Sequence, residues 1–173
     1  MEHMDTAWRS RLYHLGTGVS ISDIGFINYP EEVSIEHGAH IDDGYWFNVV
    51  TPGLGTSPKI IIRENVRCGP DVILSAINRI DLGNHVVLGS QVYISDTDHQ
   101  FREIGIPIGL QGVTSRHNRV FIGDYTWIGA NSVIVGQVTI GRNSRIAPNT
   151  VVTKDIPDNC FATGVPARIT PIQ

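Results

Sequence analysis

The segment Ile122–Thr153 reads IGDYTWIGANSVIVGQVTIGRNSRIAPNTVVT, and it decides the fold because an aliphatic residue returns at every sixth position. These anchors are Ile122, Ile128, Ile134, Ile140, Ile146 and Val152. The residue four positions after each anchor is small or β-branched. A period of six fits neither an amphipathic helix nor a long strand of alternating pattern. It predicts a solenoid in which each hexapeptide forms one short flat strand and a turn, with the anchor and its small partner pointing inward.

The same period is found earlier in the chain, so the repeat covers most of the sequence. The earlier anchors are Ile35, Ile41, Phe47, Ile62, Cys68, Leu74, Leu82, Leu88 and Ile94. Segment 48–59 breaks the period with Gly and Pro and predicts a loop, and the longer step before Leu82 predicts extra residues at a corner. Segment 95–119, which begins SDTDHQFREIG, loses the period altogether. It predicts a long excursion, and long loops on rigid scaffolds are disproportionately functional.

The two ends of the chain depart from the repeat. Residues 4–16, MDTAWRSRLYHLG, predict a short helix that stops near Gly16 and caps the open end of the solenoid. We therefore divide a single domain of 173 residues into an N-terminal cap (1–18), a β-helix (19–156) and a C-terminal tail (157–173). We expect the tail to run back along the outer surface.

Composition narrows the classes of function. The formal net charge of -4 argues against an extended basic face for nucleic acid, although it leaves room for a local basic pocket for a phosphorylated ligand. Cys68 and Cys160 are too few for a disulfide framework and are expected in the core. No apolar run approaches the roughly 18 residues that span a bilayer, and the N-terminus lacks the apolar core of a signal peptide. The expected location is the cytoplasm.

Residues 122–169 resemble the C-terminal half of the hexapeptide-repeat acyltransferases, with the signature VVTKDIP followed by GVPAR. The chain is most similar to the galactoside and maltose acetyltransferase branch, which also holds bacterial polysaccharide O-acetyltransferases, and the resemblance covers residues 35–169. It implies an all-β fold, a left-handed parallel β-helix of hexapeptide repeats. It also implies acetyl-CoA as co-substrate, no required metal, a sugar or polysaccharide precursor as acceptor, and a homotrimer with active sites between subunits.

In that family a loop leaving the β-helix carries the catalytic histidine, and the match here is His99 in SDTDHQF. Moving an acetyl group from a thioester to a hydroxyl requires a base for the hydroxyl proton, and a neutral imidazole can take it near neutral pH. The other ring nitrogen then needs an acceptor that fixes the tautomer. Asp96 and Asp98 are both candidates, and a backbone carbonyl would serve as well.

The pantetheine arm of coenzyme A is thin and requires small side chains beside it. The resemblance places Gly129, Ala130 and Ala147 along such a groove. Pro148 stands where relatives commonly have alanine, so a hydrogen bond donated from that backbone position is absent. Trp127 is expected to face outward, where it packs at the cleft beside the cofactor or only against another subunit.

The cofactor phosphates require cations, and Lys154 and Arg168 match the basic positions of the family for the nucleotide end. Thr153 can contribute a hydroxyl or frame the adenine. On the acceptor side, Asn78 at the irregular corner SAINR is a candidate for holding a sugar hydroxyl, and His117 is a candidate substrate contact where the excursion rejoins the coil.

Several alternatives stay open. An N-acetyltransferase of an amino sugar or sugar nucleotide needs the same base. A zinc enzyme of the γ-carbonic-anhydrase type requires a close pair of histidines, whereas His85, His99 and His117 are well separated and His37 and His40 lie far upstream. A non-catalytic β-helix would have no use for the long loop and the basic tail. The sequence does not disclose the acceptor.

Overall fold

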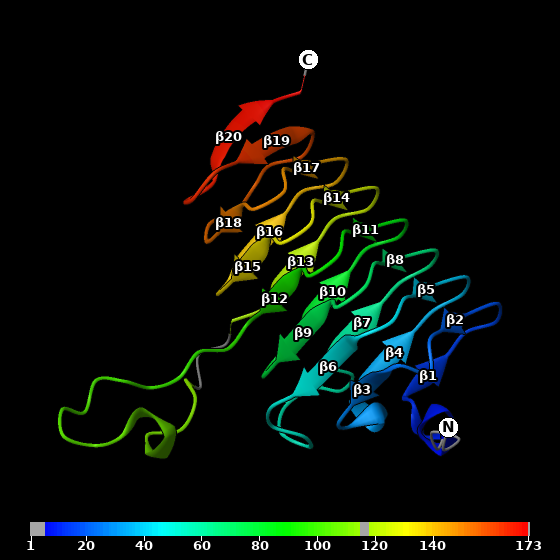
Figure 1. Cartoon of the computed structure of the whole chain (residues 1–173), viewed down its shortest axis with the longest axis horizontal. Helices are drawn as coiled ribbons and strands as arrows, with labels where there is room; N and C mark the ends of the chain where they lie inside the picture. The colour runs from blue at the N-terminus through cyan, green and yellow to red at the C-terminus, as the bar shows by residue number, and fades with distance from the viewer. Residues whose placement is uncertain (1–5, 115–117, 173) are drawn as a thin grey trace.

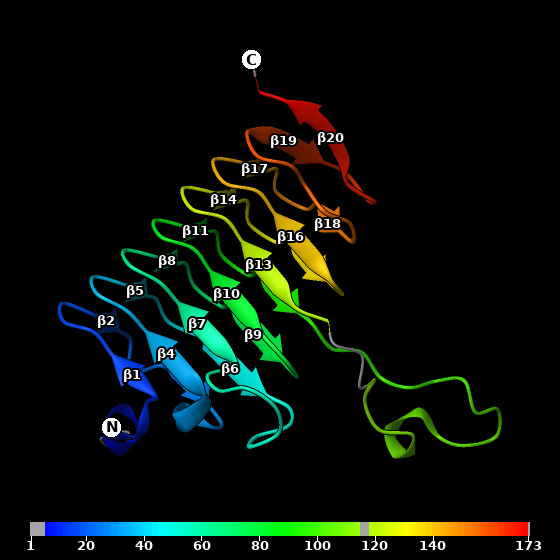
Figure 2. The same ribbon diagram turned by 180° about the vertical axis from the view of Figure 1, so that it is seen from behind.

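The computed structural model describes residues 6–114 and 118–172. The chain winds into a left-handed parallel β-helix whose coils stack along one axis, with the two ends of the chain at opposite ends of the stack (Figure 1). Each complete coil gives one short strand to each of three sheets, which we call A, B and C. The same stack seen from behind, in Figure 2, shows the excursion leaving one side of the body.

The strands are two to five residues long, and consecutive strands of a sheet come from consecutive coils. Sheet A contains β1 (His14–Leu15), β4 (Val33–Ile35), β7 (Ile60–Ile62), β10 (Ile80–Leu82), β13 (Val120–Ile122) and β16 (Val138–Ile140). Sheet B contains β2 (Ser20–Ile21), β5 (His40–Ile41), β8 (Arg67–Cys68), β11 (Val87–Leu88), β14 (Trp127–Ile128), β17 (Arg145–Ile146), β19 (Cys160–Thr163) and β20 (Arg168–Pro171). Sheet C contains β3 (Gly25–Ile27), β6 (Tyr45–Val49), β9 (Ile73–Ala76), β12 (Tyr93–Ser95), β15 (Val133–Val135) and β18 (Val151–Val152).

The predicted anchors form the core. All fifteen are at most 2% exposed, and they stack in register from coil to coil. The small residues four positions later also point inward, and their hydroxyls bond to turn carbonyls of the next coil: Thr126 Oγ1 to Gly141 O at 2.9 Å and Ser132 Oγ to Ala147 O at 3.0 Å. The interior is therefore apolar along the strands, and these hydroxyls satisfy turn carbonyls that would otherwise be unpaired.

The turns between sheets explain the many asparagines. Asn65, Asn131, Asn143, Asn149 and Asn159 all adopt positive φ. Asparagine tolerates this left-handed conformation better than most side chains because its short amide can bond locally. One such residue in a turn lets the chain change direction after only two or three residues of strand.

The N-terminal cap is shorter than predicted. It is a 3-10 helix, η1 (Thr6–Arg11), and β1 follows it before Gly16 is reached. A Cβ at Gly16 would lie 2.5 Å from the backbone nitrogen of His37 in the next coil. Close coil packing, and not helix termination, therefore explains this glycine.

The expectation that the C-terminal tail runs back over the outer surface is wrong. Instead β19 pairs in parallel with β17, and β20 folds back on β19 as an antiparallel partner. Sheet B thus gains two strands beyond the last complete coil. The antiparallel strand ends the parallel repeat at this end of the stack.

Two loops leave the edge where sheet C turns into sheet A, which we call the C–A edge. Residues 50–59 connect β6 to β7, and residues 96–119 connect β12 to β13. Two further 3-10 turns, η2 (Pro30–Glu32) and η3 (Ile108–Leu110), lie before β4 and within the long excursion. Across the described ranges, 6–114 and 118–172, no helix is long and apolar enough to cross a membrane.

Candidate active site

A hollow of about 750 Å³ lies between the base of the excursion and the outer face of sheet C. Its walls combine residues that are distant in sequence but adjacent at the C–A edge. They are Tyr93, Thr97, Asp98, His99, Gln100, Phe101, Arg102, Thr114, Asn118, Val135 and Gly136. His99, the residue that the sequence singled out, is therefore beside a space large enough for a small ligand.

The base of the excursion is a short antiparallel pairing that positions His99. The amide of Gln100 donates to Gly112 O at 3.0 Å, and the amide of Thr114 donates to Asp98 O at 2.8 Å. Between these bonds, His99 forms an isolated β-bridge with Val113. The histidine thus lies on a hydrogen-bonded stem, although the loop beyond it projects from the body (Figure 1).

Asp98 fixes the backbone of His99. One carboxylate oxygen of Asp98 accepts a hydrogen bond from the His99 amide at 2.8 Å. No hydrogen bond or ion pair to the His99 ring comes from residues 6–114 or 118–172, and the side chain is exposed. The ring is therefore open to the hollow and to solvent.

Asp96 does not orient His99 in the structure. Its carboxylate is completely buried and accepts hydrogen bonds from the backbone amides of Ile77 (2.6 Å), Asn78 (2.8 Å) and Arg79 (2.6 Å). Burial raises the pKa of Asp96, and the three amides together with the charge of Lys59 oppose that rise. Asp96 therefore holds the corner that the eight-residue step creates, and the sequence had no means to distinguish this role from that of Asp98.

Lys59 completes the same corner, and sequence reasoning missed it. Its side chain is 1% exposed, and Nζ donates to Ile77 O at 2.8 Å and to Leu54 O at 2.5 Å. The neighbouring Glu32 accepts from the Gly53 amide at 2.8 Å. The sequence does contain a sign of this role, because Lys59 directly precedes the apolar segment 60–62. A charged side chain beside a buried strand needs hydrogen-bond partners.

The residues proposed for the pantetheine groove lie along the edge where sheet B turns into sheet C, the B–C edge. Trp127 faces outward from β14 and is 40% exposed. A Cβ at Gly129 would lie 2.4 Å from the nitrogen of Pro148 in the next coil, so coil stacking explains that glycine. The Gly129 and Ala147 amides are used within the coil stack, whereas no hydrogen bond within the described ranges uses the Ala130 amide.

The residues proposed for the cofactor phosphates lie elsewhere. Thr153 and Lys154 follow β18 at the C–A edge, the same edge from which the excursion leaves, and both are exposed. Arg168 is exposed at the start of β20. Within one chain, the proposed cofactor residues thus fall on two edges and the terminal hairpin.

The candidate acceptor residues are only partly placed. Asn78 lies at the corner that Asp96 holds, because the backbone amide of Asn78 donates a hydrogen bond to the Asp96 carboxylate. His117 lies outside the described residues. His37, His40 and His85 lie on the coil surface, where they contact Thr17, Asp42 and Tyr125, respectively. In residues 6–114 and 118–172, no group of three or more His, Cys, Asp or Glu side chains could hold a metal ion.

Comparison with known proteins supports the interpretation of the repeat. The model of the bacterial transferase hexapeptide family, defined by six repeats, matches residues 119–154. Residues 119–154 therefore carry the hexapeptide repeat of this family. The match covers the coils β13 to β18, which the hexapeptide anchors had identified, and ends at Lys154.

Two curated relatives extend this likeness. A probable acetyltransferase of Mycobacterium tuberculosis is 31% identical over 157 residues, which are 90% of this chain and 48% of that protein. The putative lipopolysaccharide biosynthesis O-acetyl transferase WbbJ of Escherichia coli is 27% identical over 141 residues, 79% of this chain and 70% of that protein. The chain thus spans about half the length of the first of these relatives.

Solved structures show the same fold. A variant of AntD, an N-acyltransferase from Bacillus cereus in complex with dTDP and coenzyme A, superposes with a TM-score of 0.81 at 20% identity. The superposition covers 96% of this chain and 87% of the AntD chain. At this identity the likeness establishes the fold, a left-handed parallel β-helix.

Proposed function

We propose that this protein is an acetyl-CoA-dependent O-acetyltransferase that acts on a hydroxyl of a sugar or polysaccharide precursor. The observation that carries the proposal is the position of His99, on the stem of the excursion and beside the hollow of about 750 Å³. The names of the curated relatives, a probable acetyltransferase and a putative O-acetyl transferase, support the class of reaction. The use of acetyl-CoA would place the reaction in the cytoplasm.

In this proposal His99 acts as the general base. Its neutral ring takes the proton of the acceptor hydroxyl while the hydroxyl oxygen attacks the carbonyl carbon of the acetyl thioester. A tetrahedral intermediate forms, the carbon–sulfur bond breaks, and the proton passes from the imidazolium to the departing thiolate. The products are the acetyl ester and free coenzyme A. Asp98 contributes by fixing the backbone on which the base is carried.

Two edges of the β-helix supply the proposed cofactor residues. Ala130 offers the pantetheine arm a backbone amide that no described residue uses, with Trp127 and the exposed Pro148 on the same edge. Lys154 and Arg168 offer charges for the phosphates. A homotrimer would bring the C–A edge of one subunit toward the B–C edge of another, so that each cleft contains one His99 and one pantetheine groove.

The exposed apolar residues of the excursion support such an assembly. Phe101, Ile104 and Leu110 are 61%, 102% and 78% exposed in the single chain. A loop with so much apolar surface is unfavourable in water unless another surface covers it. A neighbouring subunit would supply that cover in the proposed trimer.

N-acetylation of an amino sugar is the second candidate, because an amine acceptor needs the same base. The N-acyltransferase AntD has the same fold, and WbbJ carries an O-acetyl transferase name. Similarity to these proteins therefore favours neither an amine nor a hydroxyl as the acceptor group. The exposed position of His99 fits both. The difference lies in the acceptor atom and is decided by the product.

The direct experiment is a screen of the purified protein with acetyl-CoA against sugars, amino sugars, sugar nucleotides and glycolipids, with thiol release as the signal. We expect release above the hydrolysis background with at least one hydroxyl acceptor. Mass spectrometry of the product, before and after mild alkali, distinguishes an ester from an amide. Transfer only to amines would reject the O-acetyl assignment, and no transfer from acetyl-CoA to any acceptor would count against the enzyme proposal as a whole.

A further inference from the structure

An arginine occupies the same position in two neighbouring coils of sheet A. Arg79 precedes β10 and Arg119 precedes β13, each directly after an asparagine, and these are the coils on either side of the excursion. The two strands pair in parallel with Ile80 opposite Val120, and the Val120 amide donates to Arg79 O at 2.9 Å. The two arginines therefore lie side by side at the C–A edge.

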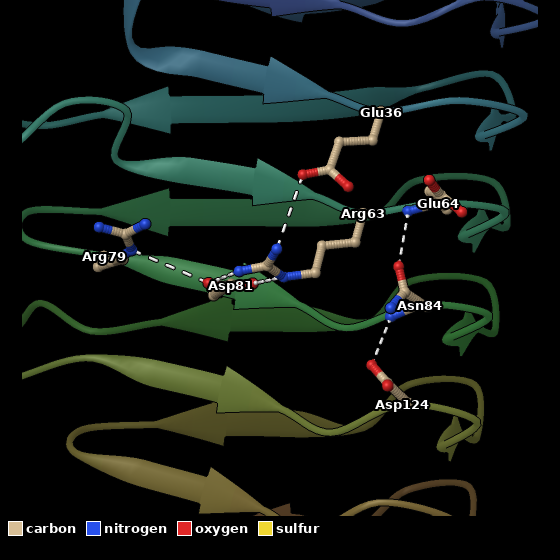
Figure 3. A network of polar contacts seen from close by, with 7 residues as sticks. All are labelled: Glu36, Arg63, Glu64, Arg79, Asp81, Asn84 and Asp124. Atoms are coloured by element: carbon tan, nitrogen blue, oxygen red, sulfur yellow. Dashed lines mark hydrogen bonds and ion pairs between the residues drawn. The ribbon is translucent and has the colours of Figure 1, made fainter.

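The positive charges of this pair are poorly compensated. The guanidinium of Arg79 forms a long ion pair with Asp81, with 3.9 Å between Nε and Oδ2. Both oxygens of Asp81 are already engaged by Arg63, at 2.8 and 2.9 Å, and Figure 3 shows the terminal nitrogens of Arg79 turned away from that pair. No ion pair of Arg119 is found within residues 6–114 and 118–172, and its side chain is exposed. Like charges on neighbouring strands are unfavourable unless an anion lies between them.

A hollow of about 330 Å³ lies at this pair of arginines. Its remaining walls are Asp81, Val120, Phe121 and Thr139. Phe121 offers an apolar face, being 38% exposed, and Thr139 is exposed on the adjacent strand β16. The hollow thus combines two cations, the carboxylate of Asp81 that Arg63 already pairs, apolar surface from Val120 and Phe121, and one hydroxyl.

This hollow and the one at His99 are lined by consecutive residues of the chain. Asn118 lines the hollow at His99, and the next residue, Arg119, lines the hollow on sheet A. Farther along the C–A edge, Lys154 adds an exposed cation two coils away.

We propose that the hollow at Arg79 and Arg119 is an anion-binding subsite that holds a phosphate group of a reactant. Arginine is suited to this because its planar guanidinium offers several donors that match phosphate oxygens. The phosphate comes either from a phosphorylated acceptor, such as a nucleotide-activated sugar, or from the nucleotide end of coenzyme A. Only the identity of the reactant rests on the proposed function, since binding of phosphate requires no turnover.

The first test measures binding of inorganic pyrophosphate by calorimetry at low ionic strength. We expect Arg119→Gln and Arg79→Gln each to weaken binding by roughly tenfold or more, the effect of losing a charge-assisted contact. Arg142→Gln is the matched control, because Arg142 is exposed on the far edge between sheets A and B. Equal binding by wild type and Arg119→Gln, or no binding by wild type, would overturn the proposal.

Thermal unfolding without ligand checks that the arginines are not structural. Arg119→Gln is expected to melt at the same temperature as wild type or higher, because it relieves repulsion with Arg79. A clear decrease in Tm would assign Arg119 a structural role and contradict the subsite. The Arg142→Gln variant again serves as the control.

Steady-state kinetics then identify the source of the phosphate. If the acceptor supplies it, Arg119→Gln raises the KM of a phosphorylated acceptor and leaves the KM of acetyl-CoA unchanged. If coenzyme A supplies it, the variant raises the KM of acetyl-CoA but not that of S-acetylpantetheine, which lacks the nucleotide. A variant with every KM unchanged would reject a reactant phosphate at this site. An inactive protein that still binds pyrophosphate through the arginines would reject the proposed function and keep the subsite.

Discussion

The carboxylate of Asp96 accepts a hydrogen bond from the backbone amide of Asn78 at 2.8 Å. The first residue of the excursion therefore fixes the irregular corner of the preceding coil. The corner and the excursion are thereby joined by hydrogen bonds. Lys59 joins them from the other loop through its bond to Ile77 O. The arrangement makes the position of His99 depend on buried polar contacts several residues away, and this dependence can be tested.

Replacing Asp96 with Asn is expected to destabilise the protein. One acceptor oxygen would remain for three backbone amides, and an unsatisfied buried donor costs about 1–3 kcal/mol. The variant should therefore show a lower urea midpoint and, because the stem is displaced, a lower kcat. Asp98→Asn is the matched control, since that carboxylate is exposed and its loss should affect stability far less. Equal midpoints for the two variants would show that the corner bonds are not important.

Substitution of the proposed phosphate contacts should affect the cofactor and not the chemical step. Lys154→Gln and Arg168→Gln are expected to raise the KM of acetyl-CoA by about three- to tenfold with kcat nearly unchanged. Each variant loses an exposed charge that would bind the cofactor equally in the ground state and in the transition state. Initial-rate measurements over a range of acetyl-CoA concentrations test this. Unchanged KM values in both variants would remove these residues from the cofactor site.

The buried thiols should be unreactive in the native protein. Burial raises the pKa of Cys68 to about 12, and Cys160 is also buried, so neither thiol is accessible to a reagent in the native protein. We expect no reaction of native protein with a disulfide reagent over minutes, and two thiols per chain after denaturation. Rapid labelling of native protein would contradict the buried positions.

Stability should fall on the alkaline side. Burial raises the pKa of Tyr45 to about 12, as it does that of Cys68, from ordinary values of 10.0 and 9.0. Groups whose folded-state pKa is raised contribute stability that is complete below the unfolded-state pKa and is lost as pH rises through the folded-state value. The free energy of unfolding is therefore expected to decrease from about pH 9 toward pH 12. Urea titrations across that range provide the measurement, and a constant free energy would contradict it.

The sequence predicted the body of the protein because the hexapeptide period is a local rule repeated many times. Each anchor, such as Ile128 or Leu88, is buried, and each departure from the period coincides with a loop or an irregular corner. The handedness of the coil came from the family resemblance. The sequence also predicted that His99 lies on the excursion, since the loss of the period marks the segment.

The sequence could not distinguish partners that only the fold brings together. Asp96 and Asp98 have the same chemistry and lie two positions apart, yet one is buried against the corner and the other is exposed on the stem. The Arg79 and Arg119 pair is separated by forty positions, most of them in the excursion. It becomes visible only when the strands are aligned across that loop.

The central claim is that His99 removes the proton from the acceptor, and the most direct measurement is the transfer rate of His99→Gln with acetyl-CoA and an acceptor at saturation. We expect a loss of at least about a hundredfold in kcat, the usual contribution of a general base, with acetyl-CoA affinity unchanged. His40→Gln, on the coil surface, should retain the wild-type rate. A His99→Gln enzyme that keeps half of the wild-type rate would contradict the account.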